Sequence, residues 1–253
     1  MPDKKPFTFI NPSPALAEFV HSYWETANQT DEPCQFTIFP DSFFKVIFYL
    51  AKGKITAYFL TGLWPKETEI TIPPRAKVYG VKFKILAPEY IFNHEMASLL
   101  QTHRELNLDF WNLNSFDFSS FEKIVEQIEV VLLEKLKSSN EVTGNKLQLS
   151  QLLYKTNGDL SAEEVSNQIA WSNRQINRYL NKYLGVSLKA YLNIQKVFAS
   201  YIQIREGRFF PDQGYHDQAH FIKTIKKHTG QTPKGLFNEK DDRFIQLKHF
   251  RKK

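Results

Sequence analysis

Cysteine is almost missing from this chain of 253 residues, because Cys34 is the only one. A single cysteine excludes an internal disulfide and indicates a reducing compartment, and we expect Cys34 to be a buried structural thiol. Long apolar runs are missing too, since none approaches the ~18 residues of a membrane-spanning helix. The first residues, MPDKKPFTFINPSP, lack the apolar core of a secretory signal. These absences predict a cytoplasmic protein that does not enter a membrane.

The residue patterns of common catalytic and metal sites are missing as well. His94 and His103 lie nine positions apart and have no neighbouring ligands at metal-binding spacing. The sequence contains no phosphate-binding loop and no nucleophile motif. It also shows no combination of acid, base and nucleophile. We therefore expect no enzyme, no catalytic residue, no metal site and no cofactor.

Charge is divided unevenly along the chain. Residues 1–150 hold 15 Lys plus Arg and 18 Asp plus Glu, a net charge of −3. Residues 151–253 hold 18 and 9, a net charge of +9. This change predicts two domains with different partners, and the basic second domain favours nucleic acid or another acidic surface.

The first half is typical of β-sheet. Runs such as QFTIFPDSFFKVIFYL and KITAYFLTGLW are rich in β-branched and aromatic residues, and Pro and Gly punctuate them. They predict an antiparallel β-barrel or sandwich. Fifteen of the 22 Phe precede residue 122. They indicate either a Phe-rich core or a barrel interior that holds a small apolar ligand near Trp64.

Helical patterns follow the strands. FSSFEKIVEQIEVVLLEKLKSS predicts an amphipathic helix whose inward side begins at Phe121. The polar stretch SSNEVTGNK (138–146) comes next and is the expected connection between domains. The predicted fold class is thus α+β: residues 1–140 form a β-rich regulatory or dimerisation domain with a helical tail, and residues 146–253 form an all-helical domain.

The stretch SNRQINRYLNKYLG (172–185) predicts a helix, and it contains signals for both the start and the end of that helix. Its apolar residues from Ile176 to Leu184 form one stripe, Ser172 is an N-cap with Gln175 as capping-box partner, and Gly185 suits the left-handed end. Three cations share the opposite face at spacings of four, with Asn beside them and no acid: Arg174, Arg178 and Lys182. Such a face is either a solvated surface or a surface that meets an anion, and like charges at this spacing repel each other, which favours the anion.

A second capped helix lies directly upstream. Ser161 and Glu164 form its capping box, and Val165 and Ile169 lie on its buried side. Ala170 and Trp171 alone separate it from the Ser172 cap, and Ala170 stands where a turn glycine would be easiest. Two short helices so joined are a helix-turn-helix, the second of which enters the DNA major groove.

Two further helices follow. VSLKAYLNIQKVFASYIQI predicts one long helix that ends near Gly207. Asp217 can then cap a helix that runs from Gln218 to His228 and ends at Gly230. This last helix is also rich in basic residues, with Lys223, Lys226 and Lys227 and no acidic residue after the cap.

Residues ~150–238 resemble the DNA-binding domain of AraC/XylS-type bacterial transcription regulators. The resemblance rests on GDLSAEEVSNQIAWSNRQINRYLNKYLGVSLKAYLNIQKVFAS and, most specifically, on GYHDQAHFIKTIKKHTGQTP (214–233). It implies two helix-turn-helix units joined by a long helix, double-stranded DNA as partner and RNA polymerase as a further contact. The β-rich half is similar to the regulatory domain of some members.

The resemblance also implies which residues meet DNA. The base-reading positions fall on Arg174, Asn177 and Arg178 in the first unit, and the exposed Arg and Asn face indicates the same set. In the second unit they fall on Gln218, Ala219, Ile222 and Lys223. Arg presented to guanine, and Ala or Ile presented to a thymine methyl, are established pairings. Phosphate contacts are expected from Ser172, Asn173, Lys182, Lys226 and Lys227.

The sequence departs from the family pattern in one segment. RFFPDQGY stands where members carry a full helix before the second reading helix, and it is too short for that helix. Pro211 would also break it. The second unit is therefore a truncated helix-turn-helix that either reads bases or only binds phosphates and supports the first unit.

Two classes of function stay open. One is a sequence-specific transcription regulator, an activator or a repressor, whose first half senses a small apolar effector or forms a homodimer. The other is a small-molecule-binding or protein-interaction module whose basic domain has lost sequence-specific DNA binding.

Overall fold

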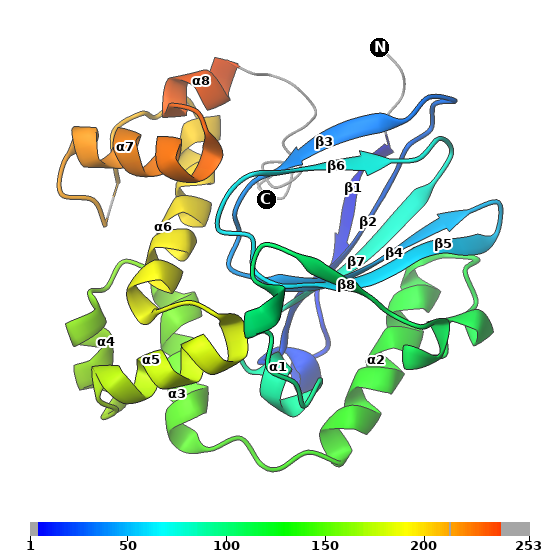
Figure 1. The fold of residues 1–253 in the computed structure, drawn as a ribbon, viewed down its shortest axis with the longest axis horizontal. Coiled ribbons are helices and arrows are strands. Elements are labelled where there is room, and N and C mark those ends of the chain that lie inside the picture. The colour runs from blue at the N-terminus through cyan, green and yellow to red at the C-terminus, as the bar shows by residue number, and fades with distance from the viewer. Residues whose placement is uncertain (1–4, 213, 239–253) are drawn as a thin grey trace.

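The computed structural model describes residues 5–212 and 214–238 and places the strands before the long run of helices (Figure 1). The strands are β1 (Lys5–Ile10), β2 (Val20–Ala27), β3 (Cys34–Ile38), β4 (Phe44–Ala51), β5 (Lys54–Thr61), β6 (Thr68–Ile72), β7 (Lys77–Phe83) and β8 (His103–Glu105). The helices are α1 (Ala87–Tyr90), α2 (Phe121–Lys137), α3 (Gly144–Thr156), α4 (Ala162–Ile169), α5 (Asn173–Leu184), α6 (Leu188–Arg205), α7 (Gln218–Thr229) and α8 (Pro233–Asn238). The predicted α+β class is confirmed.

The strands form two antiparallel sheets and not a closed barrel. Six strands pair in the order β1-β2-β7-β4-β5-β8, and β3 pairs with β6 in a separate sheet. Within the described chain β1 and β8 are the free edges of the large sheet, so the barrel alternative was wrong. The physical reason is that β4 and β7 are buried on both faces. Apolar runs of this kind do not distinguish an open, covered sheet from a barrel.

Each face of the large sheet has its own cover. Val46 and Phe48 of β4 belong to the buried cluster that includes Ile124 of α2. The alternate residues Ile47 and Tyr49 belong to the cluster that β3 and β6 complete. Successive side chains of a strand point to opposite faces, which explains the division. Cys34, expected to be buried, is only half-buried at the start of β3.

The local signals for the helices are confirmed. Ser161 with Glu164 and Ser172 with Gln175 both form complete capping boxes, at the starts of α4 and α5. Ala170 takes the left-handed conformation with a φ of 53° in the turn between them. Helix α6 continues to Arg205, and α7 begins after the Asp217 cap. Helix α3 was not expected, and it begins at Gly144, inside the predicted linker.

The two predicted domains share buried contacts in this structure. A single cluster runs from Phe48 of the large sheet to Leu153 of α3, Ile176 of α5 and Tyr191 of α6. The division at residues 138–146 remains a prediction, and residues 239–253 of the second domain lie outside the described chain. Residues 138–143 are neither helix nor strand, and most are exposed.

This segment should be the first site of proteolysis. Glu141 is exposed in it, so glutamyl endopeptidase should cut there first, because a protease needs a locally extended backbone. Glu134 is a matched control, since it is exposed too but lies within α2. Mass spectrometry of a short digestion would identify the products. Initial cleavage inside either half, with 138–146 intact, would count against the domain boundary.

Candidate nucleic-acid interface

Helix α5 separates a buried stripe from a charged face. Ile176, Tyr179, Leu180 and Leu184 are buried. The cations that we expected on the opposite face are exposed, as are the Asn residues on either side: Asn173, Arg174, Arg178, Asn181 and Lys182. The apolar stripe therefore fixes the helix against the protein, and Arg174 and Arg178 project from it one turn apart.

The first turn of α5 is built to face an anion. The Ser172 hydroxyl accepts a hydrogen bond from the Gln175 backbone N–H, and the Gln175 side chain accepts one from the Ser172 N–H at 2.9 Å. The other backbone N–H groups of this turn have no partner within the helix. Together with the helix dipole they favour a phosphate beside Ser172 and Asn173.

Asn177 is tied into the fold, unlike the two arginines. Its Oδ1 accepts a hydrogen bond from the Leu188 N–H at 2.9 Å, and its Nδ2 donates to the Asn173 carbonyl at 2.8 Å. The Leu188 N–H belongs to the first turn of α6, where backbone donors lack helical partners. Asn177 thus connects α5 to the long helix α6, a role that its residue type did not reveal.

Lys182, expected on a phosphate, already has an acidic neighbour. Its ammonium lies 3.5 Å from the Glu95 carboxylate, and both side chains are about half exposed. Exposed pairs of this kind contribute little stability, so a phosphate can replace the carboxylate at low cost.

Helix α7 presents a second basic face. Asp217 caps it by accepting from the His220 N–H at 2.7 Å. The predicted contact residues that are exposed on this helix are Gln218, Ala219, Lys223, Lys226 and Lys227. Ile222 is half-buried and packs against the cluster around Phe221, which leaves only part of it for a base.

No helix precedes α7 where the family pattern has one. Residues 208–212 and 214–217 contain no helix, as the short segment predicted. Gln203 of α6 holds the segment instead, because its Nε2 donates to the Phe210 carbonyl at 2.9 Å and its Oε1 accepts from the Asp212 N–H at 3.3 Å. Helix α7 is therefore preceded by a loop that Gln203 holds in place.

The C-terminal ends of α5 and α7 both contact the β-rich half. At the end of α5, the Met96 N–H donates to the Tyr183 carbonyl at 3.2 Å. At the end of α7, the His228 Nδ1 lies 2.6 Å from the Pro65 carbonyl, and the Glu67 N–H donates to the His228 carbonyl at 3.1 Å. A carbonyl only accepts, so Nδ1 carries the hydrogen, and burial lowers the pKa of His228 and keeps the ring neutral.

The first turns of α5 and α7 therefore project away from the sheets. Figure 1 shows α4 and α5 at one end of α6, α7 and α8 at the other, and the sheets on one side. Helix α6 has 18 residues, a length of about 27 Å, which is close to the ~34 Å repeat of B-DNA. Helix α6 thus separates α5 from α7 along its axis.

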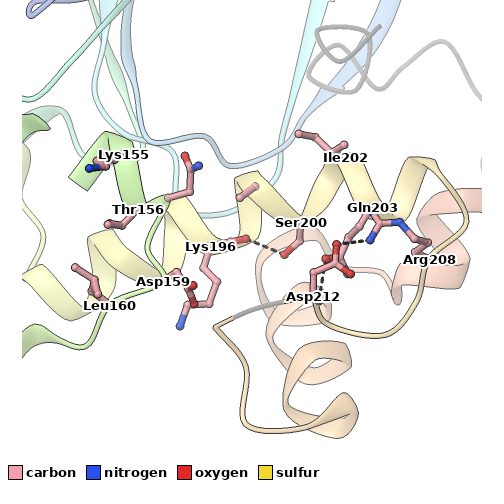
Figure 2. Close-up of a pocket in the computed structure, with 12 residues that line it drawn as sticks. Lys155, Thr156, Asp159, Leu160, Lys196, Ser200, Ile202, Gln203, Arg208 and Asp212 are labelled. Carbon is pink, nitrogen blue, oxygen red and sulfur yellow. Dashed lines mark hydrogen bonds and ion pairs between the residues drawn. The ribbon is translucent and has the colours of Figure 1, made fainter. Parts of the chain in front are cut away.

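A cleft of about 540 Å³ lies between the two units (Figure 2). Its walls come from the end of α3, from α6 and from the segment after α6. Lys196, Ser200 and Gln203 line it, and they lie on the side of α6 opposite Tyr191 and Tyr201. The charges in it nearly balance, with Lys155, Lys196 and Arg208 against Asp159 and Asp212. Arg208 is paired with Glu206 at 2.8 Å and with Asp212.

The interior between the two sheets is filled. The space there measures only about 20 Å³, room for roughly one water, and its walls are apolar apart from Thr26, Lys45 and Lys82. Trp64 is buried in the same cluster. An apolar effector would have to displace side chains to enter. The two lysines and their partner Asp41 form a buried ionic cluster that sequence patterns did not indicate.

Within residues 5–212 and 214–238, no group of three His, Cys, Asp or Glu side chains could hold a metal ion. No described helix is both long and apolar enough to cross a bilayer.

Comparisons with known proteins give matches at two levels. A family model described as a domain of unknown function, DUF6597, matches residues 8–105, a range that ends with β8. No curated protein matches the sequence. Among solved structures, apo ToxT from Vibrio cholerae has a TM-score of 0.44 and 9% identity, covering 85% of this chain and 97% of that chain. ToxT bound to an unsaturated fatty acid has a TM-score of 0.45 and 9% identity, covering 85% and 94%. A 1.65 Å structure of ToxT has a TM-score of 0.45 and 10% identity, covering 92% and 98%.

Proposed function

We propose that this protein is a sequence-specific DNA-binding transcription regulator of the AraC/XylS type that acts in the cytoplasm and catalyses no reaction. One observation carries the proposal. Two capped helices with exposed basic faces, α5 and α7, point their first turns away from the sheets and lie at opposite ends of α6. This arrangement supports reading of adjacent major grooves. The net charge of +9 over residues 151–253 supports DNA as the partner.

In the first unit α5 is the reader. Arg174 and Arg178 reach base edges or phosphates one turn apart, and Ser172 and Asn173 bring the helix N-terminus to the backbone. Lys182 leaves Glu95 for a phosphate. Asn177 holds the angle between α5 and α6, so we assign to it the positioning of the arginines in addition to any contact with a base.

In the second unit α7 contributes more to affinity than to sequence preference. Lys223, Lys226 and Lys227 bind phosphates, and Gln218, Ala219 and the exposed part of Ile222 face the groove. The absent preceding helix supports this division, because that helix would normally brace the reader against the backbone. It also supports the second candidate function, a binding module whose basic domain has lost sequence specificity.

The β-rich half regulates the reading helices. It touches α5 through Met96 and α7 through Pro65 and Glu67, so a change in its packing reaches both units. An apolar effector that opens the space between the sheets is one source of such a change, and homodimerisation is another. Contact with RNA polymerase follows from the family resemblance.

Selection of bound fragments from random or genomic DNA by the purified protein separates the two candidate functions. A regulator gives an enriched motif, an affinity ratio of roughly 10³ or more over non-specific DNA and a steep dependence on salt. A module without specificity gives no motif and a ratio near one.

Asn177→Ala should lower the free energy of unfolding by about 1–3 kcal/mol, because the Leu188 N–H at the start of α6 loses its partner. Urea denaturation followed by circular dichroism measures this. Asn181→Ala is the matched control: Asn181 is exposed on the same helix, and its loss should cost at most about 0.5 kcal/mol. Equal free energies of unfolding for the two variants would contradict a positioning role for Asn177.

Arg174→Ala and Arg178→Ala should each lose preference at one base pair, worth roughly 1–3 kcal/mol, and keep the fold, because neither side chain belongs to the buried stripe. Binding of each variant to a panel of single-base-substituted sites measures the loss, with thermal melting as the fold control. Lys182→Ala should weaken binding to every site alike. If both Arg variants bind the panel as the parent does, α5 is not the reader.

Lys223→Ala combined with Lys226→Ala should weaken binding to all sequences similarly and lower the salt slope by roughly one per lost phosphate contact. Titrations at several salt concentrations measure the slope. Lys54→Ala combined with Lys137→Ala removes two exposed lysines of the other half and should leave it unchanged. A changed base preference at one half of the site would show instead that α7 reads sequence.

A further inference from the structure

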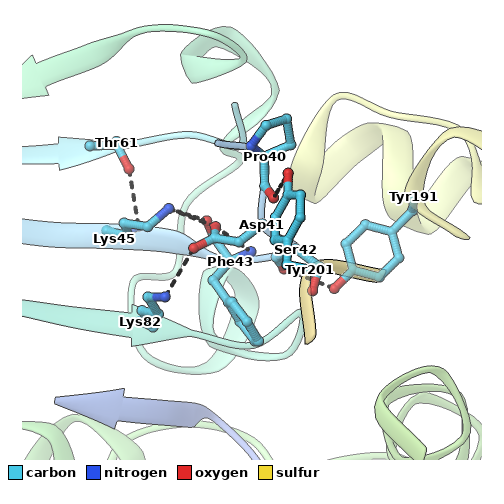
Figure 3. A network of polar contacts seen from close by, with 9 residues as sticks. All are labelled: Pro40, Asp41, Ser42, Phe43, Lys45, Thr61, Lys82, Tyr191 and Tyr201. Carbon is cyan, nitrogen blue, oxygen red and sulfur yellow. Dashed lines mark hydrogen bonds and ion pairs between the residues drawn. The ribbon is translucent and has the colours of Figure 1, made fainter. Parts of the chain in front are cut away.

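The segment Phe39–Phe43, which joins β3 to β4, carries a buried carboxylate. Asp41 is only 1% exposed, and its two oxygens face two buried ammonium groups (Figure 3). Oδ1 lies 2.7 Å from the Lys45 Nζ, and Oδ2 lies 3.1 Å from the Lys82 Nζ. Burial by itself raises the pKa of the Asp41 carboxyl, but the two ammonium groups hold it below its ordinary value. The carboxylate is therefore charged and fixed to the large sheet.

The backbone on either side of Asp41 is held by α6. The Tyr201 hydroxyl donates to the Pro40 carbonyl at 3.2 Å, and the Tyr191 hydroxyl donates to the Ser42 carbonyl at 3.0 Å. Figure 3 shows the two tyrosines on one side of the segment and the two lysines on the other. Three consecutive residues thus bind the sheet through one side chain and α6 through two carbonyls.

Aromatic packing completes this contact. Phe43 stacks on Tyr154 of α3 with ring centres 5.7 Å apart and meets Phe198 of α6 edge-on at the same distance. Phe39 lies 6.0 Å from Tyr201. The Lys82 ammonium is also 5.7 Å from the Phe198 ring, so the charge cluster itself touches α6.

The geometry leaves the segment little freedom of its own. Pro40 fixes one backbone dihedral, and the peptide units beside Asp41 are planar, so few backbone dihedrals are free between Asp41 and the flanking carbonyls. Loss of the carboxylate would leave two ammonium groups buried without it, which is costly enough to force the side chains to move or lose protons. The Lys45 and Lys82 side chains also border the space between the sheets. The segment therefore lies between the interior of the β-rich half and α6.

We propose that Asp41 is a positioning residue for the connecting helix α6 and, through α6, for the separation and angle of the two reading helices. The part that concerns α6 depends only on the contacts above, and the part that concerns DNA rests on the proposed function. Asp41 makes no contact with DNA itself in this proposal.

Hydrogen exchange by mass spectrometry tests the first part without DNA. Asp41→Asn should speed exchange over α6 and over residues 39–43 by roughly tenfold or more and leave α2 unchanged, because α2 packs on the other face of the large sheet. Asp31→Asn is the matched control, since it removes an exposed pair with Arg75 in the same half, 2.7 Å long, that does not touch α6. Equal acceleration in α2 and α6, or none in α6, would overturn the proposal.

A second variant tests the same link from the other side and serves if Asp41→Asn does not fold. Tyr191→Phe combined with Tyr201→Phe keeps both rings and removes both hydroxyls. It should speed exchange over residues 39–43 and over the adjoining start of β4 by a similar factor, since coupling is reciprocal. When the two Tyr→Phe changes are combined with Asp41→Asn, hydrogen exchange over residues 39–43 should be little faster than with Asp41→Asn alone. Unchanged exchange at 39–43, or full additivity, would contradict a shared path.

DNA fragments selected by the parent protein test the part of the proposal that concerns DNA. Insertion of one or two base pairs between the two half-sites should weaken parent binding sharply, because α6 fixes the spacing. Asp41→Asn should lose most of this spacing preference and keep the single-base preference that α5 supplies. An unaltered spacing preference would overturn the DNA part. If the parent itself shows no spacing or base preference, the proposed function fails, and the exchange result alone decides whether Asp41 positions α6.

Discussion

The burial of α6 on almost every side is the constraint on which the rest of the helical half depends. It packs against α4, α5, α7 and α8, and the β3–β4 segment contacts it through Tyr191 and Tyr201, on the side opposite the cleft. A helix held on one side only can tilt against its neighbours, whereas one held on several sides transmits displacement with little loss. The positions of α5 and α7 are consequently fixed relative to each other and to the sheets by the same set of contacts.

Helices α5 and α7 expose positively charged faces, although like charges on one helix face repel each other. Arg174, Arg178 and Lys182 repel one another at spacings of four residues, at a cost of a few tenths of a kcal/mol per pair. Among the described residues, Lys182 alone of the three has an ion-pair partner, Glu95. The buried stripe from Ile176 to Leu184 stabilises the helix by far more than this repulsion costs. A face that lowers stability and is left exposed is expected where a protein binds an anionic partner.

Features specified by neighbouring residues could be predicted from the sequence, and features specified across the fold could not. The caps at Ser161 and Ser172, the left-handed Ala170 and the limits of α5 depend on residues within a few positions, so local pattern was enough. The pairing of Asp41 with Lys82 joins residues far apart in sequence, and an isolated Lys in a strand gives no sign of burial. The bond of Asn177 to α6 escaped prediction for another reason: an Asn on an exposed helix face suits a base edge and an exposed helix N-terminus equally well. Helix α3 was missed because it begins at a glycine inside a polar stretch, and the sequence left barrel and sandwich open because a strand covered on both faces shows no alternation.

Since no helix precedes α7 in the described residues 208–212 and 214–217, other elements hold α7 in place. In a complete helix-turn-helix the first helix crosses the second and fixes its angle. Here that support comes from other elements: Gln203 orders the preceding loop, Tyr215 packs edge-on against Phe221, and the β5–β6 connection binds the end of α7 through Pro65 and Glu67. Two of these supports belong to α6 and to the loop, but the third belongs to the β-rich half. The orientation of α7 therefore depends on the β-rich half as well as on the helices, and under the proposed function this dependence gives that half a route to control DNA binding.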